Sequence, residues 1–374
     1  MIPFSKLSFW ERSVYTEGID FAIIGAGIVG MSTALHLKKR FPFAKIVILE
    51  RGYLPTGAST KNAGFTCFGS PTELRDDLSS MPEDVVWDTV EMRFNGLQEL
   101  LSLIDPSKIS YEPCGSWDLI RQDEELIPDS FLHYLNEKLA RITGQNKVYS
   151  IDQRKLEHSK FAGFKAAYQN HLEGAIHTGK LIHELYKSCI HRDIHVIFDI
   201  EVSSFEDQTE EVVLFTAHGA LKTAKLLVCT NAFASQFLDD VLPARAQALV
   251  TKPISNLAVQ GTFHVDGGYY YFRNIGDRLL LGGGRNLDFE GETTTRFEVS
   301  SLIQDNLKRM LKENILPTTP FEVDYAWSGI MAVGSEKKPI IQKTNKNIAF
   351  GVRMGGMGVA IGASVGKQLS KLIV

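Results

Sequence analysis

The chain has 374 residues, of which 44% are hydrophobic and 22% are charged, and its formal net charge is −4 at pH 7. A single core rarely grows beyond about 250–300 residues, so this length and composition predict a globular protein with two domains. The acidic balance, without a basic run, excludes the general electrostatic attraction on which binding to nucleic acids or anionic membranes depends.

Cysteine and histidine usage predicts neither a disulfide framework nor a metal site. The four cysteines are far apart, and the ten histidines form no set with the spacing of metal ligands. The N-terminus lacks the pattern of a signal peptide, and no segment offers the roughly 18–20 uninterrupted apolar residues of a membrane span. We therefore predict a cytoplasmic protein with reduced thiols, no metal and no transmembrane segment.

The first predicted element is a buried strand over residues 19–24, with the sequence IDFAII. The glycine turn GAGIVG follows directly, and MSTALHLKKR then predicts a helix with an apolar side. In this order, Gly25 permits the tight turn, Gly27 lets the backbone approach a pyrophosphate, and Gly30 allows the helix to pack on the strand. The first helical turn directs free N–H groups and the positive end of the helix dipole at the phosphates.

A second apolar strand, AKIVILE, ends at Glu50, which lies 50 − 30 = 20 residues beyond Gly30. A dinucleotide site has an acidic residue at about this spacing, where it accepts hydrogen bonds from the ribose hydroxyls of adenosine. A carboxylate here disfavours the 2′-phosphate of NADP. The pattern predicts a dinucleotide-binding domain, and by itself it leaves NAD and FAD open.

The next loop, RGYLPTGASTKNAGF, is polar, rich in glycine and longer than a simple strand–helix connection. Ser59 and Thr60 are candidates to donate hydroxyl hydrogen bonds to the pyrophosphate, and residues 62–64 are candidates to run beside a flavin ring. These further contacts favour FAD. The alternative is a surface loop without a binding role.

The segments DFAIIGAGIVGMSTALHL and VILERGYLPTGASTKNAG resemble the start of the FAD-dependent D-amino-acid oxidase superfamily, which includes glycine oxidase, sarcosine oxidase, D-amino-acid dehydrogenase and γ-glutamylputrescine oxidase-like enzymes. Later segments resemble the family in the same order over most of the chain. The resemblance implies an α/β (α+β overall) architecture, with a Rossmann-like FAD-binding domain and a second, mixed-sheet substrate domain. It also implies that Val202 lies against the adenine and that the turn at Thr230 returns to the cofactor.

The closing segment GVRMGGMGVAIGASVGKQLSKL predicts a glycine loop followed by a helix. Its glycines would let the backbone lie against a flat ring, and the helix dipole would stabilise negative charge on reduced flavin. The alternative is a tightly packed helix–sheet contact. Together, the motifs and the resemblance predict these FAD-binding residues: Gly25, Ala26, Gly27, Ile28, Val29, Gly30, Glu50, Arg51, Ser59, Thr60, Lys61, Asn62, Ala63, Gly64, Val202, Thr230, Asn231, Ala232, Gly329, Arg353, Gly355, Gly356, Met357 and Gly358.

The segments that resemble a dinucleotide-binding fold alternate with two other segments, of which the first has mainly helical patterns and the second mainly strand patterns. We therefore predict a discontinuous FAD-binding domain over residues 1–81, 150–241 and 324–374. The substrate domain is predicted over residues 82–149 and 242–323, with its sheet as a roof over the flavin.

The substrate side departs from the family pattern. Many amino-acid-oxidising members have an arginine for the substrate carboxylate just before the final loop, and Met331 in WSGIMAVG stands in its place. Methionine cannot pair with a carboxylate, so either the substrate lacks the usual α-carboxylate or another arginine binds it. Met331 also stands near the position of the cysteine that attaches flavin covalently in sarcosine oxidases, so we expect non-covalent FAD.

Arg353 is the main replacement candidate, with a packing or ion-pairing role as the alternative, and Arg285 and Arg273 are weaker candidates. Tyrosines 269–271 alternate in direction if they form a strand, so one or two of them should face the cavity. Tyr269 and Tyr271 are the substrate-positioning candidates, and a role in the core or the cavity wall is the alternative.

These features predict an FAD-dependent oxidoreductase that oxidises a small amine or amino acid by hydride transfer from the C–N carbon to flavin N5. The electron acceptor, O2 or a quinone or other carrier, and the oligomeric state stay open. The alternatives are an FAD-dependent 2-hydroxy-acid dehydrogenase, a nicotinamide-dependent dehydrogenase, and a flavin-binding protein of divergent or no activity.

Overall fold

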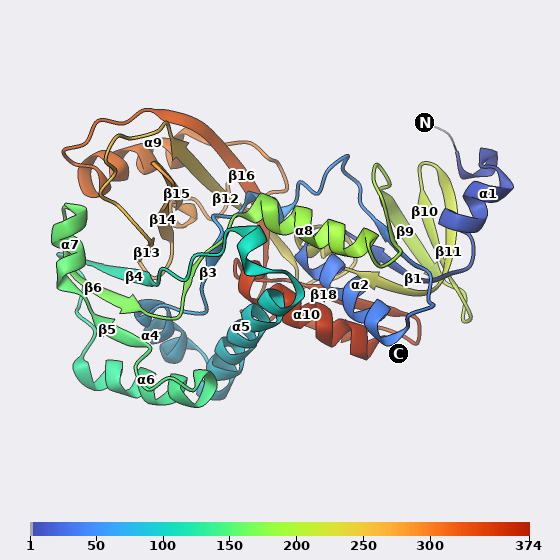
Figure 1. Cartoon of the computed structure of the whole chain (residues 1–374), viewed down its shortest axis with the longest axis horizontal. Helices are drawn as coiled ribbons and strands as arrows, with labels where there is room; N and C mark the ends of the chain where they lie inside the picture. Colours follow the sequence, from blue (N-terminus) through green and yellow to red (C-terminus); the bar gives the residue numbers. More distant parts are fainter. Residues whose placement is uncertain (1–2) are drawn as a thin grey trace.

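The structure is a computed structural model that describes residues 3–374. It is elongated, with two lobes along its longest axis (Figure 1). One lobe contains the sheet of the dinucleotide motif, and the other contains a second sheet of eight strands. The chain passes between the lobes several times, so each lobe combines segments that are distant in sequence.

The first sheet is mainly parallel, and β1 (Ile19–Ile24), predicted as a buried strand, lies at its centre with all but one of its residues buried. Its order is β17 (Ile340–Lys343), β18 (Ile348–Val352), β11 (Gly219–Val228), β1, β2 (Ile46–Leu49) and β8 (Ile194–Ile197), and the hairpin of β9 (Val202–Asp207) and β10 (Val212–Thr216) extends from β11.

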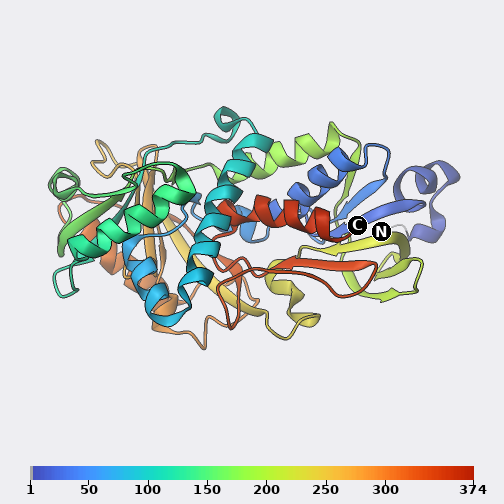
Figure 2. The ribbon, with the colours of Figure 1, turned by 90° about the horizontal axis from the view of Figure 1, so that it is seen from below.

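Helices cover this sheet: α2 (Ile28–Arg40), α8 (Thr178–Ile190) and α10 (Gly358–Leu372). α10 lies beside α2, and the long α5 (Glu83–Leu103), which begins in the second lobe, crosses α10 and ends against the first lobe (Figure 2). Ile23, Met31 and Leu37 are fully buried in the core between sheet and helices. Burial of these side chains is the main stabilising term for this lobe.

The second sheet has the order β16 (Val323–Val333), β12 (Leu242–Thr251), β15 (Arg278–Gly283), β14 (Tyr270–Ile275), β13 (Thr262–Val265), β4 (Ser116–Arg121), β6 (Phe164–Asn170) and β5 (Tyr149–Ile151). All its pairs are antiparallel except β13–β4. α9 (Ser301–Met310) covers one face, where Phe263 and Leu281 are fully buried. α4 (Pro71–Ser80), α6 (Asp129–Thr143) and α5 pack near its β5 end.

The remaining elements are short: η1 (Phe4–Lys6), α1 (Phe9–Glu11), η2 (Arg12–Thr16), α3 (Ala58–Lys61), β3 (Phe65–Thr66), η3 (Pro106–Ile109), α7 (Gln153–Ser159), β7 (Gly174–Ala175), η4 (Asn231–Gln236), η5 (Arg285–Leu287) and η6 (Leu311–Ile315).

Two strand groups cross the predicted domain boundaries. β5 and β6 pair within the second sheet, so that sheet extends to residue 170 rather than 149. β16 pairs with β12 along its length, so the second sheet also continues to residue 333 rather than 323.

Candidate active site

The glycines of the first turn leave no room for side chains. Gly25 has φ of +103°, and a Cβ on it would lie 2.8 Å from the carbonyl oxygen of Cys229. A Cβ on Gly30 would lie only 2.0 Å from the carbonyl oxygen of Gly25. The turn, the start of α2 and the end of β11 therefore contact one another without side chains between them, as binding of a pyrophosphate by backbone N–H groups requires. We call these three segments the cradle.

Glu50 lies directly after β2, beside this cradle. Its carboxylate accepts hydrogen bonds from the backbone N–H of Ala26 and of Gly52, each at 3.0 Å. The next residue, Arg51, stacks its guanidinium 3.6 Å from the ring centroid of Phe233. Glu50 is thus held at the end of the strand where the adenosine ribose of a dinucleotide binds.

Ser59 and Thr60 have different surroundings. The Ser59 hydroxyl accepts a hydrogen bond from the N–H of Ile28 at 3.1 Å, which places it at the phosphate-facing start of α2. The Thr60 hydroxyl donates instead within its own loop, to the carbonyl oxygens of Pro55 and Gly57. Of the two hydroxyls, only that of Ser59 is beside the cradle.

The segment expected beside the flavin ring is fixed from the second lobe. Asn62 accepts a hydrogen bond from the N–H of Gly64 at 2.8 Å, which shapes the local turn. Arg273, on β14, donates to the carbonyl oxygens of Gly64 at 3.1 Å and Ile176 at 2.9 Å. Its side chain is buried, so its role here is to hold the loop rather than to bind substrate.

The turn after β11 lies beside the cradle, with the Cα of Thr230 3.7 Å from where a Cβ on Gly25 would be. Val202 begins β9 and is buried. The Thr230 hydroxyl is buried without a hydrogen-bond partner, and Asn231, with φ of +49°, accepts a hydrogen bond from the N–H of Met354 at 3.2 Å. The neighbouring Ala232 is buried. An orphaned hydroxyl at this turn fits a site that a cofactor completes.

The closing loop brings the C-terminal segment against the second sheet. Gly355 and Gly356 have φ of +56° and +83°, and α10 begins two residues later, at Gly358. A Cβ on Gly356 would lie 3.3 Å from the sulfur of Met331. The side chain of Met357 contacts that of Cys67, with 3.7 Å between their sulfurs.

β16 covers the loop expected to bind FAD, residues 51–65, through two contacts with Lys61. The indole N–H of Trp327 donates to the Lys61 carbonyl oxygen at 2.9 Å. A Cβ on Gly329 would lie 2.9 Å from the Cβ of Lys61, so only glycine allows this approach. Met331, next along the same face, therefore lies above the loop and the closing glycines.

Arg353 does not present free donors to a substrate. Its guanidinium forms an ion pair with Asp240 and donates to the carbonyl oxygen of Lys338 at 2.9 Å. The side chain is nearly fully buried, and its backbone has φ of +65°. This geometry favours the ion-pairing alternative that the sequence left open.

The face of the second sheet that lies against Phe65 carries a cross-strand row of polar groups: Tyr271, His264 and Asp118 are successive register partners on β14, β13 and β4. The Tyr271 ring lies over Gly282, where a Cβ would be 2.5 Å from it. Burial raises the pKa of Tyr271 to about 12 and lowers that of His264 to about 4, with the Glu73 carboxylate opposing the second shift. Both groups are therefore neutral near pH 7.

Two buried carboxylates, that of Asp118 in this row and that of Glu173, were not predicted from the sequence. Asp118 accepts hydrogen bonds from the N–H and hydroxyl of Thr72, and Glu173 accepts from the N–H of Phe68 at 2.7 Å. Burial raises the pKa of both acids to about 7. No local motif marks them, because their partners come from distant segments.

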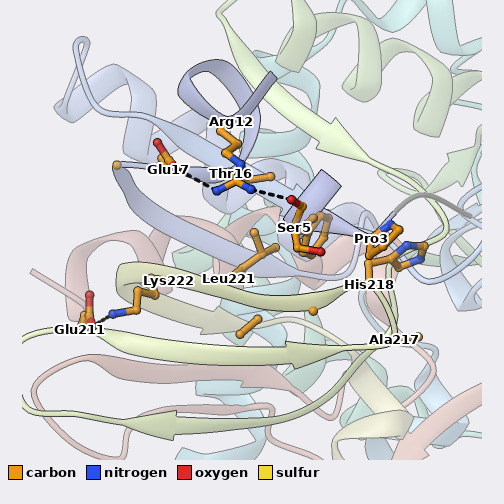
Figure 3. A pocket seen from close by; sticks show the side chains of 14 residues that line it. Pro3, Ser5, Arg12, Thr16, Glu17, Glu211, Ala217, His218, Leu221 and Lys222 are labelled. Carbon is orange, nitrogen blue, oxygen red and sulfur yellow. Dashed lines mark hydrogen bonds and ion pairs between the residues drawn. The ribbon is translucent and has the colours of Figure 1, made fainter. Parts of the chain in front are cut away.

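Two large cavities lie away from this site. One, of about 740 Å³, lies between the N-terminal segment and the β10–β11 hairpin (Figure 3). Its cations are paired: Arg12 with Ser5 and Glu17, and Lys222 with Glu211. The other, of about 640 Å³, lies between α5 and α6. Neither cavity touches the cradle or the polar row.

Two further searches concern the described residues only. Within residues 3–374, no three His, Cys, Asp or Glu side chains converge as metal ligands. Among the helices of that same stretch, none has both the length and the apolar character of a membrane span.

A parallel sheet with a glycine cradle, an acidic ribose position and a second sheet above the flavin loop define a two-lobed FAD-binding oxidoreductase. The chain belongs to the family of FAD dependent oxidoreductases (DAO), whose family model matches residues 20–372. This confirms the resemblance, the fold class and FAD as the cofactor, and the cradle, Glu50 and the orphaned Thr230 hydroxyl fit that cofactor.

Relatives agree with this assignment. The chain is similar to gamma-glutamylputrescine oxidoreductase of Escherichia coli, at 22% identity over 95% of this chain and 83% of that protein. L-2-hydroxyglutarate dehydrogenase of E. coli is 24% identical, but over only 59% of this chain and 49% of its own length. Among solved structures, glycine oxidase from Geobacillus kaustophilus has the same fold, with a TM-score of 0.76, 18% identity, and coverage of 95% of this chain and 94% of its own.

Proposed function

We propose that this FAD-dependent oxidoreductase oxidises a small amine or amino acid at the carbon next to nitrogen. When bound, FAD supplies the hydride acceptor at flavin N5. The protein positions the donor carbon under the second sheet and excludes water from it, and a substrate amine that binds in its neutral form needs no protein base. FAD is proposed to bind non-covalently, in a reducing, cytosolic environment consistent with four free thiols.

The observation that carries the proposal is the charge of the sheet face above the FAD loop. Met331, Tyr271 and His264 on this face are uncharged near pH 7, burial raises the pKa of the neighbouring Asp118 to about 7, and the buried Arg273 is committed to backbone carbonyls. These residues offer no free cation to a carboxylate on the reacting carbon, which 2-hydroxy acids and α-amino acids both carry. The face therefore suits an amine without that carboxylate better than either.

The relatives support the same choice. The amine-oxidising relative, gamma-glutamylputrescine oxidoreductase, is similar along nearly the whole chain, whereas L-2-hydroxyglutarate dehydrogenase is similar over little more than half of it. Oxidation of a 2-hydroxy acid stays the second candidate, because the sequence identity to L-2-hydroxyglutarate dehydrogenase over the matched region, 24%, is comparable with the 22% for the other relative.

Anaerobic reduction of the purified flavoprotein tests the proposal. D-amino acids, glycine, sarcosine, polyamine conjugates and 2-hydroxy acids are added singly, and bleaching of the flavin absorption is followed. We expect at least one amine to reduce the flavin and the 2-hydroxy acids to leave it oxidised. Reduction by 2-hydroxy acids alone, or by none of the compounds, contradicts the proposal. Reoxidation of the bleached enzyme by air or by a quinone then identifies the acceptor class.

A further inference from the structure

Arg285 is a half-buried cation that has no anionic partner among residues 3–374. It is the first residue after the glycine turn that ends β15. Within residues 3–374 its side chain forms neither an ion pair nor a hydrogen bond, and its Nε is buried without a partner. The nearby carboxylate of Glu292 is already engaged by Arg245, at 2.7 and 2.8 Å, and by Gln247 at 2.8 Å. A guanidinium has five donors, so this one is available for an anion.

One aromatic ring contacts this guanidinium, a second ring packs against the first, and both are partly open to solvent. Arg285 lies 4.9 Å from the ring centroid of Phe289, and Phe289 packs edge-on against Tyr269 with 6.0 Å between ring centroids. Tyr269 is 46% exposed and Phe289 45%. The carbonyl oxygen of Tyr269 accepts a hydrogen bond from Gly284 at 3.0 Å, which fixes the tyrosine beside the arginine turn. A cation with a neighbouring hydroxyl and apolar walls can bind a carboxylate with an attached carbon chain.

The position of Tyr269 places this group on the FAD-facing side of the sheet. Tyr270 points to the opposite side, where its hydroxyl accepts a hydrogen bond from Asn306 of α9. Tyr271 points to the other side, where its ring packs edge-on against Phe65. Tyr269 is the last residue of the turn before β14, and continuing the strand alternation by one residue predicts that it shares the side of Tyr271. Arg285 follows β15, whereas Met331 lies on β16, and β12 separates these two strands. At roughly 4.8 Å per strand, the two positions are about 10 Å apart across the sheet.

We propose that Arg285, with Tyr269 and Phe289, binds a substrate carboxylate that is several bonds away from the oxidised C–N carbon. The proposal rests on the amine-oxidoreductase function and narrows its substrate class to amines with a distal carboxylate. Such a substrate satisfies both halves of the site: an uncharged reacting end under Met331 and an anionic end at the partnerless guanidinium.

Binding of a ligand that cannot be oxidised tests the subsite without turnover. Pentanoate, which has one carboxylate and an uncharged far end, and its neutral analogue pentanamide are titrated into the FAD-loaded enzyme, and the Kd is measured by calorimetry and by perturbation of the flavin spectrum. We expect R285Q to raise the Kd for pentanoate at least tenfold, R285K to restore part of the loss, and Tyr269→Phe to raise the Kd two- to fivefold. Binding of pentanamide should be weak and unchanged.

R296Q is the matched control, because Arg296 is an exposed arginine in the same irregular segment and its loss changes the net charge equally. Equal effects of R285Q and R296Q, no effect of R285Q, or no pentanoate binding by the unaltered enzyme overturns the subsite. FAD content and Tm confirm that each variant is folded. If the subsite result holds while no amine reduces the flavin, the proposed function fails and the anion subsite stands.

Discussion

At the scale of single residues, Gly30 shows how closely two backbones must approach to form the cofactor cradle. An added Cβ would overlap the carbonyl oxygen of Gly25, which cannot move without displacing the turn. We expect Gly30→Ala to lower stability by on the order of 1–3 kcal/mol or more and to weaken FAD binding at least tenfold. Thermal unfolding and FAD titration of the apoprotein measure the two effects. Gly57→Ala is the control, because a Cβ there meets no atom within 4 Å; equal losses in both variants would contradict this account.

Asp118 gives the fold a pH dependence of defined sign. Its pKa is raised by burial to about 7 in the folded chain, from an ordinary value of 3.8. Between these values the folded state holds a proton that the unfolded state releases, so this residue lowers stability as pH rises from about 4 to 7. The loss is at most on the order of 4 kcal/mol.

Asp118→Asn should remove that dependence, because an amide accepts the same Thr72 hydrogen bonds without ionising. We expect the variant to gain stability relative to the original chain as pH rises toward 8, and to gain none at pH 4. Urea unfolding at pH 4, 6 and 8 measures the difference. A difference that is constant across pH would show that Asp118 does not titrate as described.

Single residues also mark the limit of sequence reasoning at the site. Gly25, Gly30 and Glu50 were predictable because their roles depend on spacing within one strand–turn–helix unit. The neighbours of Arg273 and His264 could not be predicted from the sequence, because strand pairing and the contact between the lobes determine them. Arg353 shows the same limit: its partner Asp240 is 113 residues away.

At the scale of elements, α10 depends on a glycine in α5 for its position. A Cβ on Gly96 would lie 2.3 Å from the carbonyl oxygen of Ala360, in the first turn of α10. We expect Gly96→Ala to cost about 1–3 kcal/mol and to weaken FAD retention, because it pushes away the helix start that the closing loop presents to the cofactor. Asn95→Ala, at the exposed neighbouring position, is the control. Tm and FAD content after gel filtration report the result, and unaltered values for both variants would disprove the contact's importance.

Elements also differed in how far they could be predicted. β1, the glycine turn and α2 agree with the sequence prediction, because buried strands and helix starts have local signals. β5, β6 and β16 pair in the second sheet across two of the predicted domain boundaries, since strand composition does not reveal which sheet a strand joins.

At the scale of the whole molecule, we predict that FAD is bound by three separated segments that meet only in the folded chain. We therefore expect the purified protein to be yellow, and acid precipitation to release intact FAD into the supernatant. The apoprotein should unfold at a lower temperature, and added FAD should raise Tm with its concentration, by about 2.7 kcal/mol of stability at 100 times Kd. Flavin that stays with the precipitate would contradict non-covalent binding, and an FAD-independent Tm would contradict binding to the folded state.

The sequence alone determined the dinucleotide motif, the family resemblance and the departure at Met331, because each depends on residues close together in the chain. Only the tertiary structure decided that Arg353 is paired, that Arg273 supports the FAD loop and that Arg285 has no partner. The physical reason is that the availability of a charge depends on which groups surround it in space, and those groups come from strands and loops distant in sequence.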